Sequence, residues 1–524
     1  MESIFHLNSG ATPIFVAAVA TIILFYILLF GFRPPRIPSI TRPSLPPGPS
    51  GLPIVGNLPF LEAELHSFFT RLASTYGPIF RLRLGSKLAI IISSPTLARE
   101  ILHDQDLAFA NHDVPAAARA ITYGGADILW TPHGPTWRML RRICVRELLS
   151  PTSLAAVYHH RRRQIRSAIR RLYEHAAVGD PVNVGDQIFV AVLNVVTSML
   201  WGGTVEVENG STDDLQVGRQ FRELVGEITL LLGKPNLSDF FPELERFDLQ
   251  GIVRKMDVLR EKLDEIYDNI IESKRKGSKV KAGEDFLDYM LKAEDEGLET
   301  NTTFTITHVK AMLMEIVVAG TDTTSNAVEF ALAEMLNRVE TMKRVQDELE
   351  HVVGKHNIVE EHHIDKLPYL NATIKEVLRL HPTVPLLVPH RPSSTCTVGG
   401  YMVPEGSRVF INAWAIHRDP AIWKEPLEFK PERFMNTIHE RKWDGNGNDF
   451  NYLPFGSGRR ICAGIAMAEK MLAYCLASLL HSFDWKLEEG KKLDLSEKFG
   501  IVLKKAEPLV VIPVARLSNP DLYY

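Results

Sequence analysis

Cysteine is scarce in this chain: only four occur, Cys144, Cys396, Cys462 and Cys475. They lie far apart and form no Cys-x-x-Cys pair, so the sequence predicts neither a disulfide framework nor a zinc cluster. Free thiols are typical of a reducing compartment. The chain also lacks a glycine-rich dinucleotide fingerprint after a predicted strand, so any electrons from a nicotinamide must come through another protein.

Excess charge is absent as well, because the formal net charge is -4 and 23% of residues are charged. This balance gives no indication of nucleic-acid binding. The hydrophobic content of 45% is ordinary for a globular protein. A length of 524 residues alone would suggest about two to four domains, although a single large catalytic domain remains possible.

Charged side chains are missing from residues 11–32, an apolar run long enough to cross about 30 Å of hydrocarbon as a helix. A cleaved signal peptide is the alternative, but the run exceeds a usual signal core and ends without a small-residue cleavage site. We therefore predict a retained transmembrane anchor at 11–32 behind a lumenal tail at 1–10. Arg33, Arg36 and Arg42 follow the span, which places the body on the cytoplasmic face.

Residues 33–53 are basic and rich in proline. The part from Pro43 to Pro53 suits neither a helix nor a central strand. We predict a stiff hinge there, with a flexible linker as the alternative, and a catalytic domain at 54–524.

Hydrophobic periodicity in that domain predicts several helices and a small β region. Strands are predicted at 79–84, 88–93, 384–391, 409–413 and 509–513. Helices are predicted at 95–103, 307–338, 369–380 and 465–480, and helical stretches alternate with polar breaks from 181 to 291. Residues 108–130 show no clear period and are predicted to form a long substrate-contacting loop, and 274–281 to form a surface loop.

The stretch from Phe455 to Gly464 has the features of a loop that delivers Cys462 to a metal. Gly456 and Gly458 permit a positive φ and a close approach to a flat ligand. A helical pattern follows Gly464, so the sulfur would lie near a helix N-terminus, where negative charge is stabilised. A buried cysteine that only packs is the alternative.

Five residues of this stretch match the pattern Phe-x-x-Gly-x-Arg-x-Cys-x-Gly: Phe455, Gly458, Arg460, Cys462 and Gly464. Here the chain resembles the cytochrome P-450 family of haem-thiolate monooxygenases. The resemblance, which extends from about residue 46 to 513, implies the cytochrome P-450 fold, mainly α with a minor β region, around haem b. It also implies that Cys462 is the proximal iron ligand, that Phe455 covers the sulfur's side of the haem, and that Arg460 meets a propionate.

The predicted long helix contains Ala319-Gly320-Thr321-Asp322-Thr323-Thr324. Glycine, aspartate and threonines are poor residues for the middle of an apolar helix, and such a local conflict often marks function. The hydroxyl of Thr323 can compete for backbone carbonyls and open the helix to water. The resemblance places this segment over the iron, with Asp322 and Thr323 relaying protons. A kinked structural helix is the alternative.

Further cofactor and structural roles also follow from the resemblance. Trp137 and Arg141 lie one helical turn apart and resemble the family's propionate clamp, although a surface stacking pair has the same spacing. Arg391 falls near a propionate by family position. Glu376 and Arg379 resemble the Glu-x-x-Arg helix, whose buried charge network Arg433 would complete.

Family position also indicates an apolar substrate pocket, which suits an apolar guest. Core packing would explain any single member of the set equally well. The candidates are Phe109, Ile316, Val317, Ala319, Val384, Leu387, Phe499, Ile501 and Val502.

The resemblance implies a membrane monooxygenase of the endoplasmic reticulum that inserts one oxygen atom of O2 into a small apolar metabolite. Electrons would come from NADPH through a separate flavin-containing NADPH-cytochrome reductase. A basic stretch at 159–171 is either a solvated helix face or a docking surface for that reductase.

The chain looks like plant microsomal members that hydroxylate terpenoids or phenolics. We favour a sesquiterpene-like terpenoid over a flavonoid. A haem-thiolate isomerase or dehydratase that needs no O2 or reductase is an alternative, but Asp322 and Thr323 are retained and favour monooxygenation. A tethered scaffold without a cofactor is a third possibility.

Overall fold

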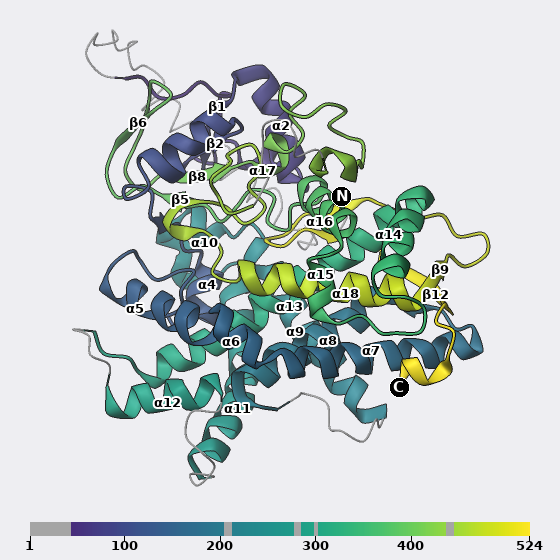
Figure 1. Cartoon of the computed structure of the whole chain (residues 1–524). Helices are drawn as coiled ribbons and strands as arrows, with labels where there is room; N and C mark the ends of the chain where they lie inside the picture. Colours follow the sequence, from purple (N-terminus) through teal and green to yellow (C-terminus); the bar gives the residue numbers. More distant parts are fainter. Residues whose placement is uncertain (1–42, 204–211, 277–284, 298–301, 436–444) are drawn as a thin grey trace, which may run out of the picture.

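The computed structural model describes residues 43–203, 212–276, 285–297, 302–435 and 445–524. The predicted lumenal tail, the anchor and the first part of the hinge lie outside the described residues. The fold is mainly helical, and a smaller β region that includes β1, β2, β5, β6 and β8 lies on one side of the helices (Figure 1). This confirms the predicted fold class.

The helices carry the labels of Figure 1, and η marks short 3-10 or π-helical turns. The α-helices are α2 (Leu65–Tyr76), α3 (Pro95–Arg99), α4 (Ala116–Ile121), α5 (Pro135–Ile143), α6 (Pro151–Ala156), α7 (Tyr158–Val178), α8 (Val184–Trp201), α9 (Thr212–Gly233), α10 (Leu237–Phe240), α11 (Ile252–Lys276), α12 (Phe286–Glu296), α13 (Ile306–Asn337), α14 (Val339–Val352), α15 (Glu361–Ile364), α16 (Pro368–Leu380), α17 (Ala413–Ile416) and α18 (Ile465–Ser482). The turns are η1 (Leu58–Phe60), η2 (Glu100–Asp104), η3 (Cys144–Leu148), η4 (Pro242–Phe247), η5 (Pro431–Phe434), η6 (Gly458–Arg460) and η7 (Pro520–Tyr523).

The strands form small sheets, the largest with the order β1-β2-β8-β5-β3. Within it β1 and β2 form an antiparallel hairpin, β2 pairs in parallel with β8, and Ile90 lies opposite Val409. The other sheets have the orders β4-β12-β9, β6-β7 and β10-β11. The strands are β1 (Ile79–Leu84), β2 (Lys87–Ile92), β3 (Asn111–His112), β4 (Val182–Asn183), β5 (His390–Arg391), β6 (Cys396–Val398), β7 (Tyr401–Val403), β8 (Arg408–Ile411), β9 (Phe483–Lys486), β10 (Glu497–Lys498), β11 (Lys504–Lys505) and β12 (Val510–Ala515).

Helix α13 runs through the core, in contact with α8, α16 and α18, because most of its circumference is apolar. It spans Ile306–Asn337, close to the predicted 307–338. Helix α8 is long and apolar enough to cross a membrane, but 89% of that window is buried inside the protein. We therefore interpret α8 as a core helix that packs against α13.

The predicted hinge is docked onto the body from Pro43 onward. The amide of Met402 donates to the carbonyl of Ser44 at 2.9 Å, and the amide of Arg81 donates to that of Pro47 at 2.8 Å. A Cβ at Gly48 would lie 2.1 Å from the carbonyl oxygen of Arg81, so only glycine allows this approach. Residues 44–48 of the hinge are therefore packed along β1.

The strand predicted at 384–391 is wrong over most of its length. Only His390–Arg391 form a strand, β5. Leu387 adopts φ 49°, and its amide donates to the carbonyl of Val384 at 3.1 Å, as in a turn. Pro385 and Pro389 remove ladder donors from this segment. The segment therefore turns rather than extends.

Two predicted loops contain more regular structure than expected. The stretch 108–130 holds β3 and α4, whose alanines are buried. Helix α11 continues to Lys276, into the predicted loop at 274–281, and the remainder of that loop lies outside the described residues. The other predicted strands and helices are confirmed to within a few residues, and the one at 95–103 continues from α3 into the π-helical η2.

Candidate functional site

The cysteine loop has the tight geometry that its glycines predict. Gly456 and Gly458 adopt φ 72° and 70°. A Cβ at Gly458 would lie 2.1 Å from the carbonyl oxygen of Leu102 in η2. The amide of Cys462 donates to the carbonyl of Phe455 at 3.1 Å, and α18 begins at Ile465. The loop is therefore a close-fitting turn that fixes the position of Cys462.

The sulfur of Cys462 faces space enclosed by the protein. The residue is exposed, yet burial by the surrounding atoms raises the pKa of its thiol. The amide of Gly464 donates to Sγ at 3.3 Å and Arg141 lies nearby, and both lower that pKa without overcoming burial. The helix N-terminus alone does not make the thiolate, whereas a coordinated metal ion would, because it deprotonates its thiol ligand outright.

Helix α13 presents one accessible stripe in an otherwise buried stretch. Glu315, Ile316, Ala319, Gly320 and Thr323 keep accessible surface, and their spacing puts them on one helical face. Glu315 on this face accepts a hydrogen bond from the amide of Ile128 at 2.7 Å, and the carbonyl of Ile128 accepts a hydrogen bond from Arg460 of the cysteine loop at 2.8 Å. The stripe and the sulfur therefore belong to the same interior site.

Asp322 and Thr323 have different surroundings. The hydroxyl of Thr323 donates to the carbonyl of Ala319 at 2.6 Å on the accessible side. Asp322 is buried and forms an ion pair with Lys504 at 2.9 Å, and the side-chain amide of Asn326 donates to it at 3.1 Å. Thr323 thus lines the open stripe, while Asp322 is held from the β10–β11 side of the helix.

Trp137, Arg141 and Arg460 come together as the motifs predicted. The guanidinium carbons of Arg141 and Arg460 lie 5.6 and 4.8 Å from the Trp137 ring centre. Arg460 donates to the carbonyls of Ala110, Ile128 and Thr131 at 2.6 to 2.8 Å. Burial lowers the pKa of Arg460 to about 10. The cluster therefore joins α5, the cysteine loop and the segment before α5.

Arg391 does not join this cluster, because it is exposed on β5. Its neighbour His390 is buried, and its Nδ1 hydrogen-bonds to the carbonyl of Phe109 at 2.7 Å. The ring of His112 lies 5.0 Å away and bonds in the same way to the carbonyl of Leu129. Burial lowers the pKa of His390 to about 4, so it is neutral at physiological pH. Sequence reasoning missed both histidines, although the alternation of β5 could have indicated His390.

Glu315 is a further residue that sequence reasoning missed. Its carboxylate accepts a hydrogen bond from the amide of Ile128 at 2.7 Å. The carbonyl of Ile128 in turn accepts a hydrogen bond from Arg460. Burial raises the pKa of Glu315 to about 7. The peptide at Ile128 is thus held between α13 and the cysteine loop. The signal in the sequence that could have indicated Glu315 was an acidic residue inside an apolar helix.

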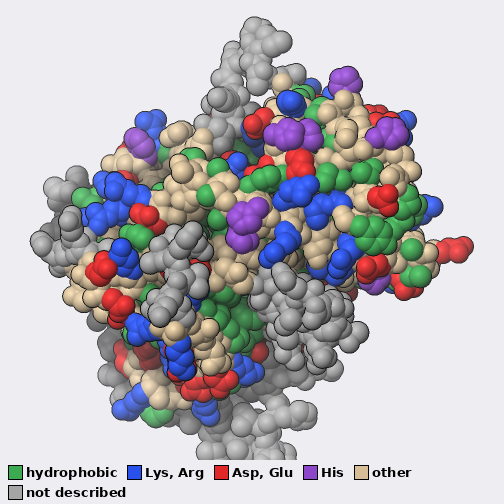
Figure 2. All heavy atoms as spheres, turned by 60° about the horizontal axis from the view of Figure 1, so that its bottom comes forward, with side chains coloured by type: hydrophobic (Ala, Val, Ile, Leu, Met, Phe, Trp, Pro, Cys, Tyr) green, Lys and Arg blue, Asp and Glu red, His purple; other side chains and the backbone are tan. Residues whose placement is uncertain are grey.

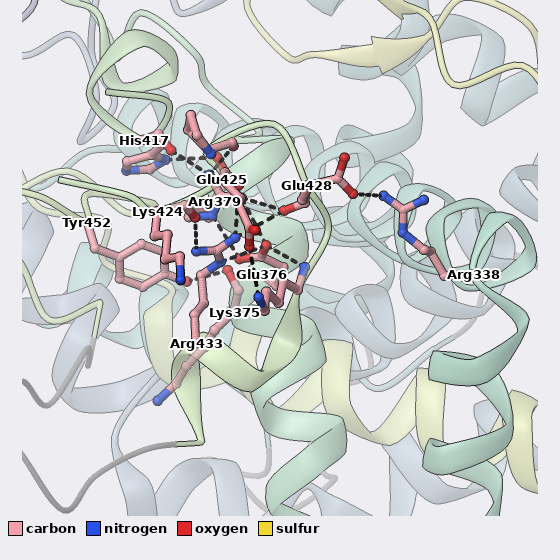
Figure 3. A network of polar contacts seen from close by, with 12 residues as sticks. Arg338, Lys375, Glu376, Arg379, His417, Lys424, Glu425, Glu428, Arg433 and Tyr452 are labelled. Atoms are coloured by element: carbon pink, nitrogen blue, oxygen red, sulfur yellow. Dashed lines mark hydrogen bonds and ion pairs between the residues drawn. The ribbon is translucent and has the colours of Figure 1, made fainter. Parts of the chain in front are cut away.

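The predicted network of Glu376, Arg379 and Arg433 is present (Figure 3). Glu376 and Arg379 are 0% exposed, and Arg379 donates to both carboxylate oxygens at 2.8 and 2.9 Å. Arg433 adds a third donor at 3.0 Å, and the amide of Lys430 a fourth at 2.7 Å. Such a carboxylate has exchanged hydration for fixed donors, as a buried charge requires.

The network extends to the segment that leads into the cysteine loop. Arg379 donates to the carbonyls of His417 and Pro426 at 2.6 and 2.8 Å. Nε2 of His417 accepts the amide of Leu453 at 2.8 Å, and the hydroxyl of Tyr452 donates to the carbonyl of Lys375 at 3.0 Å. Figure 3 shows His417 and Tyr452 on the same side of Glu376. The charges on α16 therefore position the approach to Cys462.

Several predicted pocket residues surround one apolar cavity. Val384, Leu387, Phe499 and Ile501 line a cavity of about 110 Å³ together with residues of α2, α10 and β8. Ile316 and Ala319 lie on or beside the open stripe of α13. Phe109, Val317 and Val502 are instead buried in the protein core, and Val317 lies on the opposite side of α13 from the stripe.

The basic stretch at 159–171 lies on α7 and is partly neutralised within the protein. Arg161 is fully buried against Glu361, and Arg162 pairs with Glu360 at 2.9 Å. His159, Arg162 and Arg166 line a surface cleft of about 580 Å³ near the C-terminus. Figure 2 shows groups of Lys and Arg side chains on both halves of this face of the molecule, with several His side chains toward the upper right. The solvated helix face therefore describes His159, Arg162, Arg163 and Arg170, which are exposed, but not Arg161, which is buried.

Comparisons with known proteins agree with this architecture. The sequence profile of the family Cytochrome P450 matches residues 46–512. The chain is 41% identical over 470 residues to geraniol 8-hydroxylase of Swertia mussotii, covering 89% of this chain and 92% of the relative. It is 38% identical over 480 residues to a flavonoid 3'-monooxygenase of Crocosmia x crocosmiiflora, covering 91% and 94%. A zebra fish cytochrome P450 solved with progesterone has a TM-score of 0.72 and 27% identity, covering 86% and 99%.

The chain therefore belongs to the cytochrome P450 family and is a haem-binding monooxygenase. The residues present fit the cofactor. The indole nitrogen of Trp137 is buried with no hydrogen-bond partner among the described residues, and two arginines flank its ring. One donor and two cations suit the carboxylates of a haem, and an accessible sulfur suits its iron.

Replacing Glu376 with alanine tests the buried network. The change leaves Arg379 and Arg433 without their carboxylate, which should cost about 3–5 kcal/mol of folding free energy and yield haem-free, unfolded protein. Circular dichroism and the haem absorbance of the purified protein measure this. Glu272→Ala, which breaks an exposed pair with Lys276, is the matched control and should change stability by less than about 0.5 kcal/mol. A folded, haem-loaded but slow Glu376→Ala enzyme would contradict the structural role.

Proposed function

We propose that this monooxygenase hydroxylates a small apolar terpenoid, sesquiterpene-like in size. The observation that carries the proposal is the apolar wall formed by Val384, Leu387, Phe499 and Ile501. Asp113, Asp239 and Arg408 also line the cavity, but Asp113 pairs with Arg408, and Asp239 accepts the amide of Ala116 at 2.7 Å. Because these partners already occupy the polar groups, the several hydroxyls of a flavonoid would lose hydration there without full replacement. A flavonoid or other phenolic is the second candidate, supported by the flavonoid 3'-monooxygenase among the relatives.

In this proposal Cys462 ligates the haem iron, and Phe455 and Gly464 shape the loop around the sulfur. Trp137, Arg141 and Arg460 face the propionates. Haem with a thiolate ligand supplies the oxygen-activating chemistry. The role of the surrounding protein is to hold the substrate against an apolar wall and to exclude water from it.

Proton delivery falls to Asp322 and Thr323. Lys504 donates to Oδ1 of Asp322 at 3.0 Å and is itself partly exposed, so it connects the buried acid with solvent. On the open stripe the hydroxyl of Thr323 is anchored to the carbonyl of Ala319. Protons would therefore pass from Lys504 to Asp322 and reach the stripe through the hydroxyl of Thr323 or water.

Electrons would come from NADPH through the flavins of a separate NADPH-cytochrome reductase in the same membrane. Arg161 and Arg162 form ion pairs within the protein, which reduces the positive charge that the basic stretch at 159–171 can offer to the reductase. Arg138, Arg142 and Arg146 on and after α5 are exposed beside the helix that carries Trp137, and they offer an alternative cationic surface.

The anchor at 11–32 would hold the body on the cytoplasmic face of the endoplasmic reticulum. Exposed apolar side chains support a membrane contact at the end where the hinge leaves: Phe60, Phe247 and Leu249 are 53%, 52% and 60% exposed. The amide of Ser86, next to the hinge, donates to the carbonyl of Phe240 at 2.9 Å, which places η1 and η4 at this same end.

Replacing Cys462 with serine should abolish both activity and the optical signature of the carbon monoxide complex, because that signature depends on sulfur ligation. The absorbance difference between reduced and carbon monoxide-bound protein measures it. Cys396→Ser is the control, because Cys396 lies on β6 outside the cysteine loop and its partly exposed thiol donates to the carbonyl of Ser394. An unchanged spectrum with retained turnover in Cys462→Ser would overturn the ligand assignment.

Microsomes that contain the protein and a reductase should add one oxygen atom to a sesquiterpene hydrocarbon and leave a flavonoid unchanged. The two substrate classes are supplied in parallel with NADPH, and mass spectrometry identifies the products. Microsomes with Cys462→Ser provide the background. Oxidation of the flavonoid alone would replace the terpenoid proposal with the second candidate.

Replacing Phe247 and Leu249 with aspartate should weaken the membrane association of a chain without residues 1–32, because it removes apolar area from the contact. Flotation with phosphatidylcholine vesicles measures the bound fraction. Leu427→Asp is the control, because Leu427 is 73% exposed elsewhere on the surface. Equal losses in both variants would remove the support for a specific contact at this end.

A further inference from the structure

Glu497 on β10 is a mostly buried acid that four other side chains approach. Its carboxylate meets Nδ1 of His381 at 2.6 Å and Nε1 of Trp414 at 3.1 Å. Nε2 of His66 lies at 3.3 Å and the guanidinium of Arg418 at 3.7 Å. The side chain is 13% exposed, so these partners replace most of its hydration.

The partners of Glu497 come from elements far apart in the sequence. His66 lies in α2, His381 follows α16, and Trp414 belongs to α17. The guanidinium carbon of Arg418 lies 3.8 Å from the Trp414 ring centre. Glu497 therefore ties β10 to three helical segments of the body.

His381 connects Glu497 with α13. Its Nε2 lies 2.8 Å from a carboxylate oxygen of Glu334, and its ring stacks on Phe330 with 4.3 Å between centroids. Because a carboxylate faces each ring nitrogen, both nitrogens must donate, which requires the imidazolium. Burial alone would lower the pKa of His381, but its bonds to Glu334 and Glu497 raise it. Burial would raise the pKa of Glu497, but His381 and His66 lower it well below its usual value.

The pocket wall begins two residues after Glu497. Phe499 and Ile501 line the apolar cavity and lie in the loop between β10 and β11. The Phe499 ring lies 5.6 Å from that of His66, so His66 touches both the acid and the wall. At its other end the loop is held by the amide of Leu503, which donates to the carbonyl of Thr383 at 2.8 Å.

We propose that Glu497 is a positioning residue that sets the shape of the substrate pocket by fixing the loop 499–502 against α2 and α17. Its charged hydrogen bonds hold one end of the loop where the β10–β11 ladder contributes only two residue pairs. Through the loop, Glu497 determines how closely Phe499 and Ile501 approach a bound molecule. The inference rests on the proposed function, in which these side chains face the substrate.

The test uses two haem-binding probes of different size, imidazole and 4-phenylimidazole, with the full-length haem protein. Both ligands shift the haem absorbance, so their dissociation constants are read without turnover. The phenyl ring adds an apolar group that imidazole lacks, so a change in the apolar wall should affect the larger probe more than imidazole. Glu497→Gln should weaken 4-phenylimidazole about ten-fold, because a charge-assisted contact is lost, and should change imidazole binding by less than about two-fold.

Glu497→Asp keeps the charge and should restore part of the affinity for the phenyl probe. Glu507→Gln is the matched control, because Glu507 is exposed just beyond β11 in the same hairpin. It should change neither constant. If Glu497→Gln fails to load haem, Trp414→Phe decides: it removes only the 3.1 Å bond and should weaken the phenyl probe by about two- to three-fold.

Unchanged affinity for 4-phenylimidazole in haem-loaded Glu497→Gln would overturn the proposal. Equal losses for both probes would overturn it as well, because they would show general support of the haem site rather than of the wall. If the wild-type protein oxidises no sesquiterpene while Glu497→Gln still weakens 4-phenylimidazole alone, the proposed substrate class fails and the positioning role stands, so the two failures are distinguishable.

Discussion

The site depends on the hydrogen bonds and ion pairs that the buried carboxylate of Glu376 forms. It lies fully buried, and two arginines with one backbone amide supply its donors. Each arginine passes further hydrogen bonds to backbone carbonyls between His417 and Glu428. A buried charge tolerates little displacement of its partners. One negative charge therefore fixes an irregular segment that is not part of a sheet or a long helix. His417 in that segment accepts the amide of Leu453, and this bond positions the residues that lead to Cys462.

Different faces of helix α13 have different surroundings and different partners. The face with Ala319 and Thr323 is accessible, whereas Asp322 is buried in an ion pair with Lys504. Further along, Glu334 receives His381 and so connects α13 with the loop that carries Phe499. The helix is thus linked to the cysteine loop through Glu315 and the peptide at Ile128. It is linked to the loop of the pocket wall through Glu334 and His381, which bonds to Glu497. Polar residues in its apolar pattern mark these two attachments.

Much of the architecture follows from local patterns in the sequence. The long apolar run of α13, the hairpin of β1 and β2, and the cysteine loop are each specified within a short window, and they were predicted to within a few residues. The turn after Val384 was not, because three apolar residues between prolines match a strand when only periodicity is considered. The prolines remove the donors that a strand requires.

Side chains whose role depends on distant partners could not be predicted. His417 bonds to Leu453 and Glu497 to His66, and neither residue stands in a recognisable spacing in the sequence. The cysteine motif and the Glu-x-x-Arg pair were found because their partners lie close in sequence or follow a known pattern. The exposure of Arg391 has a similar origin, since the alternation of a two-residue strand decides which neighbour points inward.

The docking of the hinge along β1, with Gly48 against the carbonyl of Arg81, has a consequence for substrate supply. Residues 44–48 are bonded to the sheet and cannot swivel relative to it, so the chain reaches the body at a fixed point beside β1. The cavity shares α10 and the end of β1 with that same pole of the molecule. If the anchor and the terpenoid substrate are as proposed, a lipophilic compound dissolved in the adjoining bilayer would enter by lateral diffusion, and its partition coefficient rather than its aqueous solubility would govern occupancy.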